Sequence, residues 1–301
     1  MSAFIIYQSV ASGIATGSIY ALLAISLVII YKSTEVVNFA GGDVLMVGAY
    51  LGMLSLVYFG LPYIATFGFA ALGVFVIAGG FEFFVLRSIG RRQRHGHAQV
   101  VSLVVATIGL AFMMRGVVRL FNYTEQPRRL APLFRGPPVH FGSVILQRQD
   151  VAIIVISVLL MAVIFTFFRY TLAGKALQAA SQNPSAARLI GIPVRNMRTL
   201  VWGGACAISA LSGVLIGGKF LMTPDFGGDV VLLAFAAAII GGFRSLPGAV
   251  LGGILLGVVQ NFVGFYISSS AISVAPFLVI MIVLLVRPQG MLGGASILRK
   301  V

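Results

Sequence analysis

The sequence predicts an all-α integral membrane protein with about eight transmembrane helices. Of its 301 residues, 59% are hydrophobic and only 9% are charged. A soluble domain has too little interior to bury so large an apolar fraction. Many of the apolar runs are about twenty residues long, whereas a strand of a membrane β-barrel needs only about ten, so the spans are expected to be helices.

The spans themselves are expected where apolar runs lie between polar segments. Residues 1–301 form one transmembrane domain with approximate halves 1–148 and 149–301. Residues 121–150 are too polar and proline-rich to span, although residues 139–146 could form a short hairpin on the membrane surface. The expected spans, with one further short apolar run at 230–240, cover about residues 10–31, 44–57, 62–86, 100–120, 151–168, 200–221, 247–266 and 274–286.

The basic residues predict the orientation in the membrane. No Lys or Arg precedes Lys32, whereas residues 87–94, 169–198 and 287–300 are rich in both, so these three segments are expected in the cytoplasm. The N-terminus would then lie outside and the C-terminus inside a bacterial cytoplasmic (inner) membrane. Residues 121–150 carry four arginines, which favours the inside, but the number of spans places them outside.

The net charge of +14 would suggest nucleic acid in a soluble protein. Here the cations lie beside apolar spans, where positive-inside topology and contact with anionic membrane lipid account for most of them. No basic and aromatic patch lies outside the spans, so we expect no nucleic-acid partner.

An internal repeat relates the two halves. The sequence Gly-Gly-Asp-Val at 41–44 recurs at 227–230. With span 1 running inward and the span at 200–221 running outward, the two copies would form an inverted repeat, unless glycine-rich helices match by chance. At the offset that relates 41–44 to 227–230, the further matches are Gly17 with Gly203, Ala21 with Ala207, Ala24 with Ala210 and Ser26 with Ser212.

A small-residue stripe on span 1, formed by Gly13, Gly17, Ala21 and Ala24, predicts close helix packing.

Polar residues beside glycines are the best candidates for a substrate path. Glycines allow a helix to begin inside the membrane, which exposes backbone groups that could meet a zwitterion. The aspartates are expected to serve as helix N-caps at the interface, a role that is compatible with a substrate path. The candidates are Asn38, Gly41, Gly42 and Asp43 in the first copy, and Gly227, Gly228 and Asp229, preceded by Asp225, in the second.

Other charged residues have simpler expected roles. Arg115 and Arg119 lie one turn apart and are expected to reach lipid headgroups, with contact to substrate or a partner chain as the alternative. Glu82 is expected to pair with Arg87 or its neighbours. Cys206, the single cysteine, is expected to serve packing.

No residue pattern predicts an enzyme. His95 and His97 stand in a basic loop without further ligands nearby, so a solvated loop is favoured over a metal site. The sequence also lacks the Gly-x-x-x-x-Gly-Lys-Ser/Thr phosphate loop, so we expect neither ATP binding in the usual P-loop manner nor another cofactor in this chain.

Residues 171–197 form the longest polar interruption of the second half. Asn183 followed by Pro184 predicts a helix start, Arg188 suits the end of that helix, and Gly191 stops it. The expected result is a short helix between two spans, which could serve as a contact for a partner or be an ordinary basic loop.

Four motifs, in order along nearly the whole chain, resemble the branched-chain amino acid ABC importers, and specifically the first of their two permease subunits. The sequence departs from the family's usual residues at three places, and these departures leave the substrate in doubt. Gly41 stands where histidine is common, Gln260 where some relatives have glutamate, and Ser181-Gln182 where an acidic residue is frequent. The motifs are Val37-Asn38-Phe39-Ala40-Gly41-Gly42-Asp43, Gly174-Lys175-Ala176-Leu177 continued by Asn183-Pro184 to Gly191-Ile192, Ile240-Gly241-Gly242-Phe243-Arg244-Ser245-Leu246-Pro247-Gly248-Ala249, and Leu285-Val286-Arg287-Pro288-Gln289-Gly290.

The resemblance implies a permease subunit that moves branched-chain or other hydrophobic amino acids inward. Its partners would be ABC ATPase subunits that bind the ATP, a second homologous permease and an extracytoplasmic substrate-binding protein. Alternatives are an importer for urea, short amides or aromatic acids, or an ion-coupled secondary transporter. The substrate path could lie within this chain or between permeases. Coupling to the ATPase is expected through Gly174, Ala180, Asn183, Pro184, Ala187, Arg188 and Gly191.

Overall fold

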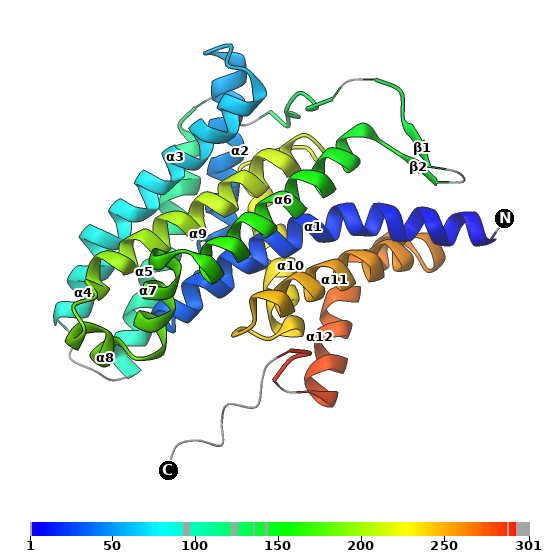
Figure 1. Ribbon diagram of the computed structural model, residues 1–301. Helices are drawn as coiled ribbons and strands as arrows, with labels where there is room; N and C mark the ends of the chain where they lie inside the picture. The colour runs from blue at the N-terminus through cyan, green and yellow to red at the C-terminus, as the bar shows by residue number, and fades with distance from the viewer. Residues whose placement is uncertain are drawn as a thin grey trace.

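The computed structural model describes residues 2–92, 97–121, 124, 126–134, 136–141, 144–287 and 289–292, and helices dominate it (Figure 1). The first half contains α1 (Ser2–Thr34), α2 (Gly41–Val57), α3 (Tyr63–Phe81), a π-helical turn (Glu82–Leu86), α4 (Arg87–Arg92), α5 (His97–Arg119), β1 (Val139–Phe141) and β2 (Val144–Leu146). The second half contains α6 (Arg148–Tyr170), α7 (Leu172–Gln182), α8 (Pro184–Leu189), α9 (Val194–Gly217), α10 (Phe226–Gly241), α11 (Leu246–Tyr266), a 3-10 turn (Ser269–Ser273) and α12 (Ala275–Val286).

The helices confirm the predicted fold class. Within the described ranges, six segments are long and apolar enough to cross a membrane: α1, α3 with its continuation, α5, α6, α9 and α11. The shorter apolar helices α2 and α12 bring the number to the eight expected spans. Helix α10 corresponds to the further short apolar run that was noted at residues 230–240. The largest differences are at the beginnings of α1, at Ser2 and not at 10, and of α9, at Val194 and not at 200. The first turn of α9 is helical although it is polar, so the apolar run begins later than the helix.

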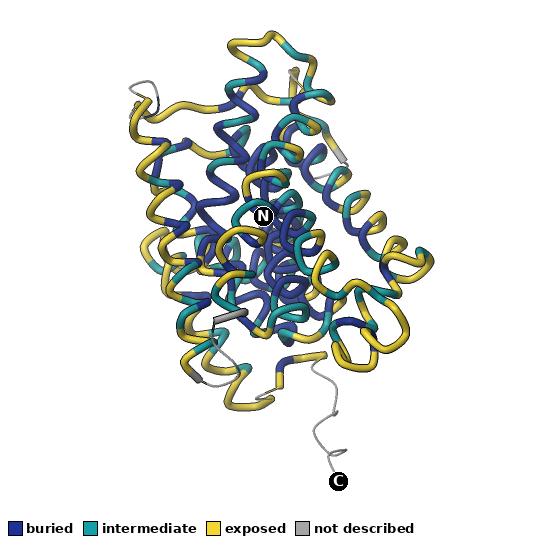
Figure 2. The backbone as a smooth tube through the Cα atoms, turned by 90° about the vertical axis from the view of Figure 1, so that its left-hand side faces the viewer, coloured by how far each residue is buried: buried dark blue, intermediate teal, exposed yellow. Residues whose placement is uncertain are grey.

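Helix α1 is the centre of the bundle. Its most apolar window is 94% buried, and it packs against α6, α9, α10 and α11. Figure 2 shows the buried residues gathered in the middle of the molecule, with exposed residues on the outer helices. The small-residue stripe behaves as predicted, because Gly13, Gly17 and Ala21 lie against the backbone of α11 near Gly253 and Gly257.

The arrangement of the helices confirms the inverted repeat. Helix α1 packs against α9, α10 and α11, and its counterpart α9 packs against α1, α2 and α3. The two helices run in opposite directions. Lys219, just beyond the end of α9, donates to Thr16 in the first half of α1 at 3.2 Å. Asn38, just beyond the end of α1, lies 4.0 Å from the sulfur of Cys206 near the middle of α9.

The segment between α5 and α6 lies at the same end of the bundle as the chain's N-terminus (Figure 1). The predicted hairpin is present as β1 paired antiparallel with β2. Gln8 of α1 makes two hydrogen bonds to the backbone of Ile145, and the Leu130 N–H donates to the Gly217 carbonyl at the end of α9. Helices α7 and α8 lie at the opposite end, where Leu177 and Gln178 face Lys32 across a small cavity. The number of spans therefore correctly predicted that this arginine-containing loop lies at the end of the bundle opposite α7 and α8. The charge of the loop predicted the wrong end.

Candidate functional site

Two short helices of the repeat, α2 and α10, begin inside the bundle and meet at their first turns. Gly42 of α2 lies so close to Gly227 of α10 that a methyl group on either glycine would overlap the carbonyl oxygen of the other. Only glycine permits this approach of backbone to backbone. The N-terminal ends of both helices, where the dipole is positive, therefore lie together.

Ion pairs with α5 surround this crossing. Asp43, in the first turn of α2, accepts hydrogen bonds from Arg115 Nε at 2.7 Å and Nη2 at 3.2 Å. Asp225, the residue before α10, accepts from Arg119 Nη2 at 2.7 Å, and Arg115 Nη1 lies 3.9 Å from its other oxygen. Two arginines one turn apart on α5 thus connect the beginnings of the two repeat-related helices.

These contacts overturn two predictions. The aspartates were expected to be N-caps, but Ala40 precedes α2, Asp225 precedes α10, and neither helix has a side-chain cap. The Asp43 side chain is instead turned to Arg115, while the first-turn position still suits a carboxylate. Arg115 and Arg119 were expected to reach headgroups, but both pair within the chain because α5 places them beside the aspartates.

The remaining predicted path residues lie at the same crossing. Asn38 is buried, and its side-chain oxygen accepts a hydrogen bond from the Ala40 N–H at 3.1 Å, which fixes the turn into α2. Gly41 packs against Leu27, and Gly228 has open space beside it. Asp229 is exposed on α10 and has no described partner. The structure therefore brings together all seven residues predicted from the two glycine-rich motifs.

A row of aromatic rings, which the sequence did not reveal, leads from the crossing toward the α7–α8 end. Phe39 contacts Phe235 of α10 with tilted rings whose centroids are 5.6 Å apart, and Phe235 contacts Phe243 at 6.4 Å. Phe243 in turn contacts Tyr31 near the end of α1 at 5.1 Å. These rings come from two segments that are distant in the sequence, Tyr31–Phe39 and Phe235–Phe243, so no local pattern could indicate the row.

The coupling segment contains α7 and α8 as two capped helices. Asn183 caps α8 by accepting from the N–H groups of Ser185 and Ala186 at 3.1 and 2.9 Å, and Pro184 is its first residue. Gly191 follows with φ +82°, a conformation that favours glycine and ends the helix. These three local predictions are confirmed.

Burial divides this segment into an anchored side and a free tip. Gly174 packs against the backbone of Phe167 and Phe168, and Ala180 and Ala187 are buried. Arg188 is exposed, and its side chain donates to the Pro184 carbonyl at 3.1 Å. At the end of α8, Leu189 is 89% exposed and Ile190 is 74% exposed. Small residues thus hold the segment in place, and two large apolar side chains project from it.

Replacing Asn183 by alanine is expected to destabilise α8 by about 1 kcal/mol, because two N–H groups lose their acceptor. Amide hydrogen exchange of residues 184–190 should accelerate accordingly. Asn183→Asp keeps an acceptor at the same place and should exchange like the unaltered chain. Equal acceleration in both variants would show that the cap does not hold α8.

A cavity of about 630 Å³ lies beside the coupling segment, between α8, α9 and the ends of α1 and α5. Its lining includes Glu82, which was expected to pair with Arg87. The described ion pairs do not contain that pair, and Glu82 instead accepts a hydrogen bond from the Thr199 hydroxyl of α9. The Arg87 guanidinium lies over the Phe83 ring at 4.7 Å. The π-helical turn directs Glu82 inward to α9, so the sequence neighbours Glu82 and Arg87 do not meet.

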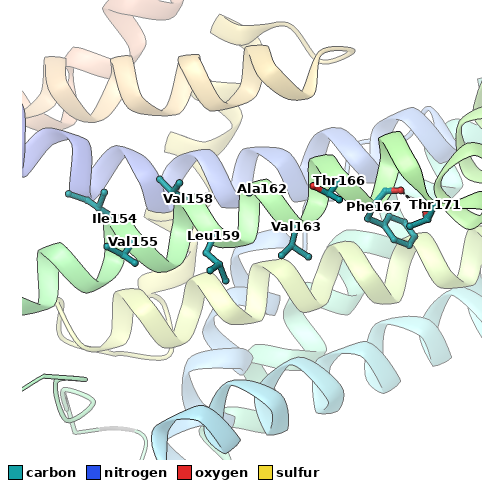
Figure 3. Close-up of a pocket in the computed structure, with 9 residues that line it drawn as sticks. All are labelled: Ile154, Val155, Val158, Leu159, Ala162, Val163, Thr166, Phe167 and Thr171. Carbon is teal, nitrogen blue, oxygen red and sulfur yellow. Dashed lines mark hydrogen bonds between the residues drawn. The ribbon is translucent and has the colours of Figure 1, made fainter.

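Helix α6 bears a second groove of about 840 Å³ along its outer face. Figure 3 shows its lining, which comes from α6 and the residue that follows it and is apolar except for two threonines. This face contains no charged group. The lining residues are Ile154, Val155, Val158, Leu159, Ala162, Val163, Thr166, Phe167 and Thr171.

The remaining sequence candidates do not add to the site. Cys206 is fully buried, in agreement with a packing role. Gln260 is buried and donates to the Ile272 carbonyl at 3.4 Å. His95 and the side chain of His97 lie outside the described residues.

Comparisons with known proteins agree with the motifs. Residues 9–286 match a family described as "Branched-chain amino acid transport system / permease component". The chain is 31% identical to the high-affinity branched-chain amino acid transport system permease protein LivH of Escherichia coli (strain K12), with 96% of each chain covered. It is 29% identical to the corresponding protein BraD of Pseudomonas aeruginosa, again over 96% of each chain. It is 26% identical to a probable LivH of Methanocaldococcus jannaschii, over 90% of this chain and 88% of the relative. The predicted resemblance is therefore confirmed, and the chain belongs to the family of permease components of branched-chain amino acid transport systems.

Proposed function

We propose that this chain is the permease subunit of an ABC importer that moves branched-chain or other hydrophobic amino acids inward, driven by ATP hydrolysis on a partner subunit. The observation that carries the proposal is the α7–α8 segment, which is anchored by buried alanines and ends in exposed Leu189 and Ile190. Exposed apolar side chains on a rigid element are typical of a docking contact. When the ATPase subunits close on ATP, a subunit bound to this tip could transmit the movement to α6 and α9.

The orientation follows from the same segment. With α7 and α8 in the cytoplasm, the beginning of α1 and the hairpin of β1 and β2 would lie outside, because they are at the opposite end of the bundle (Figure 1). Met291 and Leu292 donate backbone hydrogen bonds to Ile240 and Gly241 at the inner end of α10, so the end of the described chain lies inside. The outer end would then receive the substrate-binding protein.

The charges on α5 and α10 favour a path between this chain and a second, homologous permease. Arg119, Asp225 and Asp229 are all exposed on neighbouring helices. An ionised side chain facing lipid near the bilayer centre costs about 2.5–3.5 kcal/mol on insertion scales. We infer that this face is covered by the second permease and a hydrated path, while the uncharged α6 groove of Figure 3 faces lipid.

Ion coupling is the less favoured alternative. Both Asp43 and Asp225 are bound to arginines, so they are not free carboxylates waiting for a proton or sodium ion. The relatives named above are described as branched-chain amino acid permeases, which favours that substrate class over urea or amides. Among such amino acids the substrate-binding protein is expected to make the final selection.

Reconstitution tests the proposal. The chain is placed in liposomes with its ATPases, its second permease and its substrate-binding protein, and uptake of labelled leucine is measured. We expect uptake only when ATP and the binding protein are both present. Uptake at an equal rate without the ATPases, driven by an ion gradient, would contradict the proposal.

A further inference from the structure

The two ion pairs at the α2–α10 crossing differ in strength. The Asp43 side chain is only 5% exposed and accepts two hydrogen bonds from Arg115. The Arg119 and Asp225 side chains are 54% and 58% exposed and share one hydrogen bond at 2.7 Å. A buried pair is costly to break because one charge is left without its partner. An exposed pair is worth only about 0–1 kcal/mol, so a ligand can replace it readily.

Arg115 also has N–H donors that Asp43 does not use. A guanidinium group carries five N–H donors, and Asp43 engages two of its nitrogens, Nε and Nη2. The third nitrogen, Nη1, lies 3.9 Å from Asp225, which is beyond hydrogen-bond distance. A carboxylate approaching from the exposed side could therefore accept from Arg115 without disturbing Asp43. Asp43 then acts as a positioning residue that holds the guanidinium in place.

We propose that the transported amino acid binds at this place as a zwitterion and replaces the Arg119–Asp225 pair. Its α-carboxylate accepts hydrogen bonds from Arg119 and from the unused donors of Arg115. Its α-ammonium donates to Asp225. An amino acid carries its two charges on neighbouring atoms, and the exchange keeps every charge paired, as a site within a membrane requires. This inference rests on the proposed function and adds the substrate contacts to it.

Apolar surface lies next to the charges, where the substrate side chain would project. The exposed Phe112 ring lies 5.8 Å from the Arg115 guanidinium. Phe39, four residues before Asp43 in the chain, is 44% exposed and contacts Phe235. A branched aliphatic side chain would bury apolar area on these rings, at about 25 cal/mol per Å². Paired charges beside exposed aromatic rings fit a hydrophobic amino acid better than they fit urea or a sugar.

The test measures binding to the purified complex of both permeases and the ATPases, without the substrate-binding protein. Three probes are compared: leucine, leucinamide (which lacks the carboxylate) and isocaproate (which lacks the ammonium). The variants are Asp225→Asn and Arg119→Gln. The control is Lys219→Gln, which removes another ion pair at 2.7 Å, that of Lys219 after α9 with Asp150 of α6. Because this pair is more buried than Arg119–Asp225, thermal unfolding checks that the variant stays folded.

We expect the unaltered complex to bind leucine at least tenfold more tightly than either analogue. Asp225→Asn should weaken leucine binding about tenfold and should not weaken isocaproate, because isocaproate has no ammonium to lose and no longer competes with Asp225 for Arg119. Arg119→Gln should weaken leucine and should not weaken leucinamide, since that probe has no carboxylate and no longer competes with Arg119 for Asp225. Lys219→Gln should resemble the unaltered complex with all three probes.

A merely structural role for the pair predicts a different pattern. If Asp225→Asn weakened leucine and isocaproate equally, or weakened neither, the inference would be overturned. Absence of leucine binding to the unaltered complex at millimolar concentration would overturn it too. In each case ATP-driven leucine uptake by the unaltered complex would still support the proposed function. If the unaltered complex showed no such uptake, both the proposed function and this inference would be contradicted.

Discussion

Replacing Leu189 and Ile190 together by aspartate is expected to abolish ATP-driven uptake while leaving the permease folded. Both side chains project from the end of α8 and are mostly exposed, so the isolated chain loses little when they change, within about 0.5 kcal/mol. In the assembled importer each would be buried against the ATPase. Full burial of such a side chain is worth about 1.5–3 kcal/mol, so the double change should weaken the contact at least about 100-fold.

The measurement is uptake and ATP hydrolysis by the reconstituted importer, with thermal unfolding of the permease as the check on folding. Ser185→Asp is the matched control, because it adds a negative charge at the other end of the same exposed helix. That charge suits the first turn of a helix and should leave uptake near its original rate. Full uptake by the Leu189/Ile190 double variant would mean that the ATPase docks elsewhere.

Replacing Gly42 or Gly227 by alanine is expected to destabilise the chain by about 4 kcal/mol or more. The atoms that a new methyl group would overlap are backbone carbonyls of the facing helix, so no flexible side chain can move aside. Helices α2 and α10 would have to separate, which would also disturb the Asp43–Arg115 pair. Protein interiors are close-packed and absorb such shifts poorly.

The yield of folded protein from membranes and its unfolding temperature measure this effect. Gly228→Ala is the control, because open space lies where its methyl group would be. Alanine is also the better helix former, so this variant should be as stable as the unaltered chain or more so. Equal loss in Gly227→Ala and Gly228→Ala would show that the crossing is not the tight contact described above.

Local and periodic features of this fold were predictable from the sequence. Apolar runs gave the spans because the membrane requires about twenty apolar residues in a helix. Asn183, Pro184 and Gly191 predicted α8 because caps depend on the residues beside them. The repeated Gly-Gly-Asp-Val predicted the inverted repeat of α2 and α10 and the candidate path residues, but the contact of Gly42 with Gly227 came only from the structure.

Contacts between distant segments were not predictable in the same way. Arg115 and Asp43 are 72 residues apart, and Arg119 and Asp225 are 106 apart. Their pairing depends on how α5 lies against the two short helices, which no local pattern encodes. Glu82 was assigned to a neighbouring cation for the same reason, although the π-helical turn directs it to Thr199. The only signal in the sequence was two arginines one turn apart within an apolar span, which implies that acidic partners lie nearby.

Purification of the tagged chain from its native membrane, followed by identification of the bound chains, tests the central claim most directly. The unaltered chain should retain a Walker-motif ATPase and a second permease. The Leu189→Asp/Ile190→Asp variant should retain the second permease and lose the ATPase. Recovery of the unaltered chain alone or as a homo-oligomer, still active in vesicles without ATP, would contradict the importer account and direct attention to Asp229 as an ion-coupling residue.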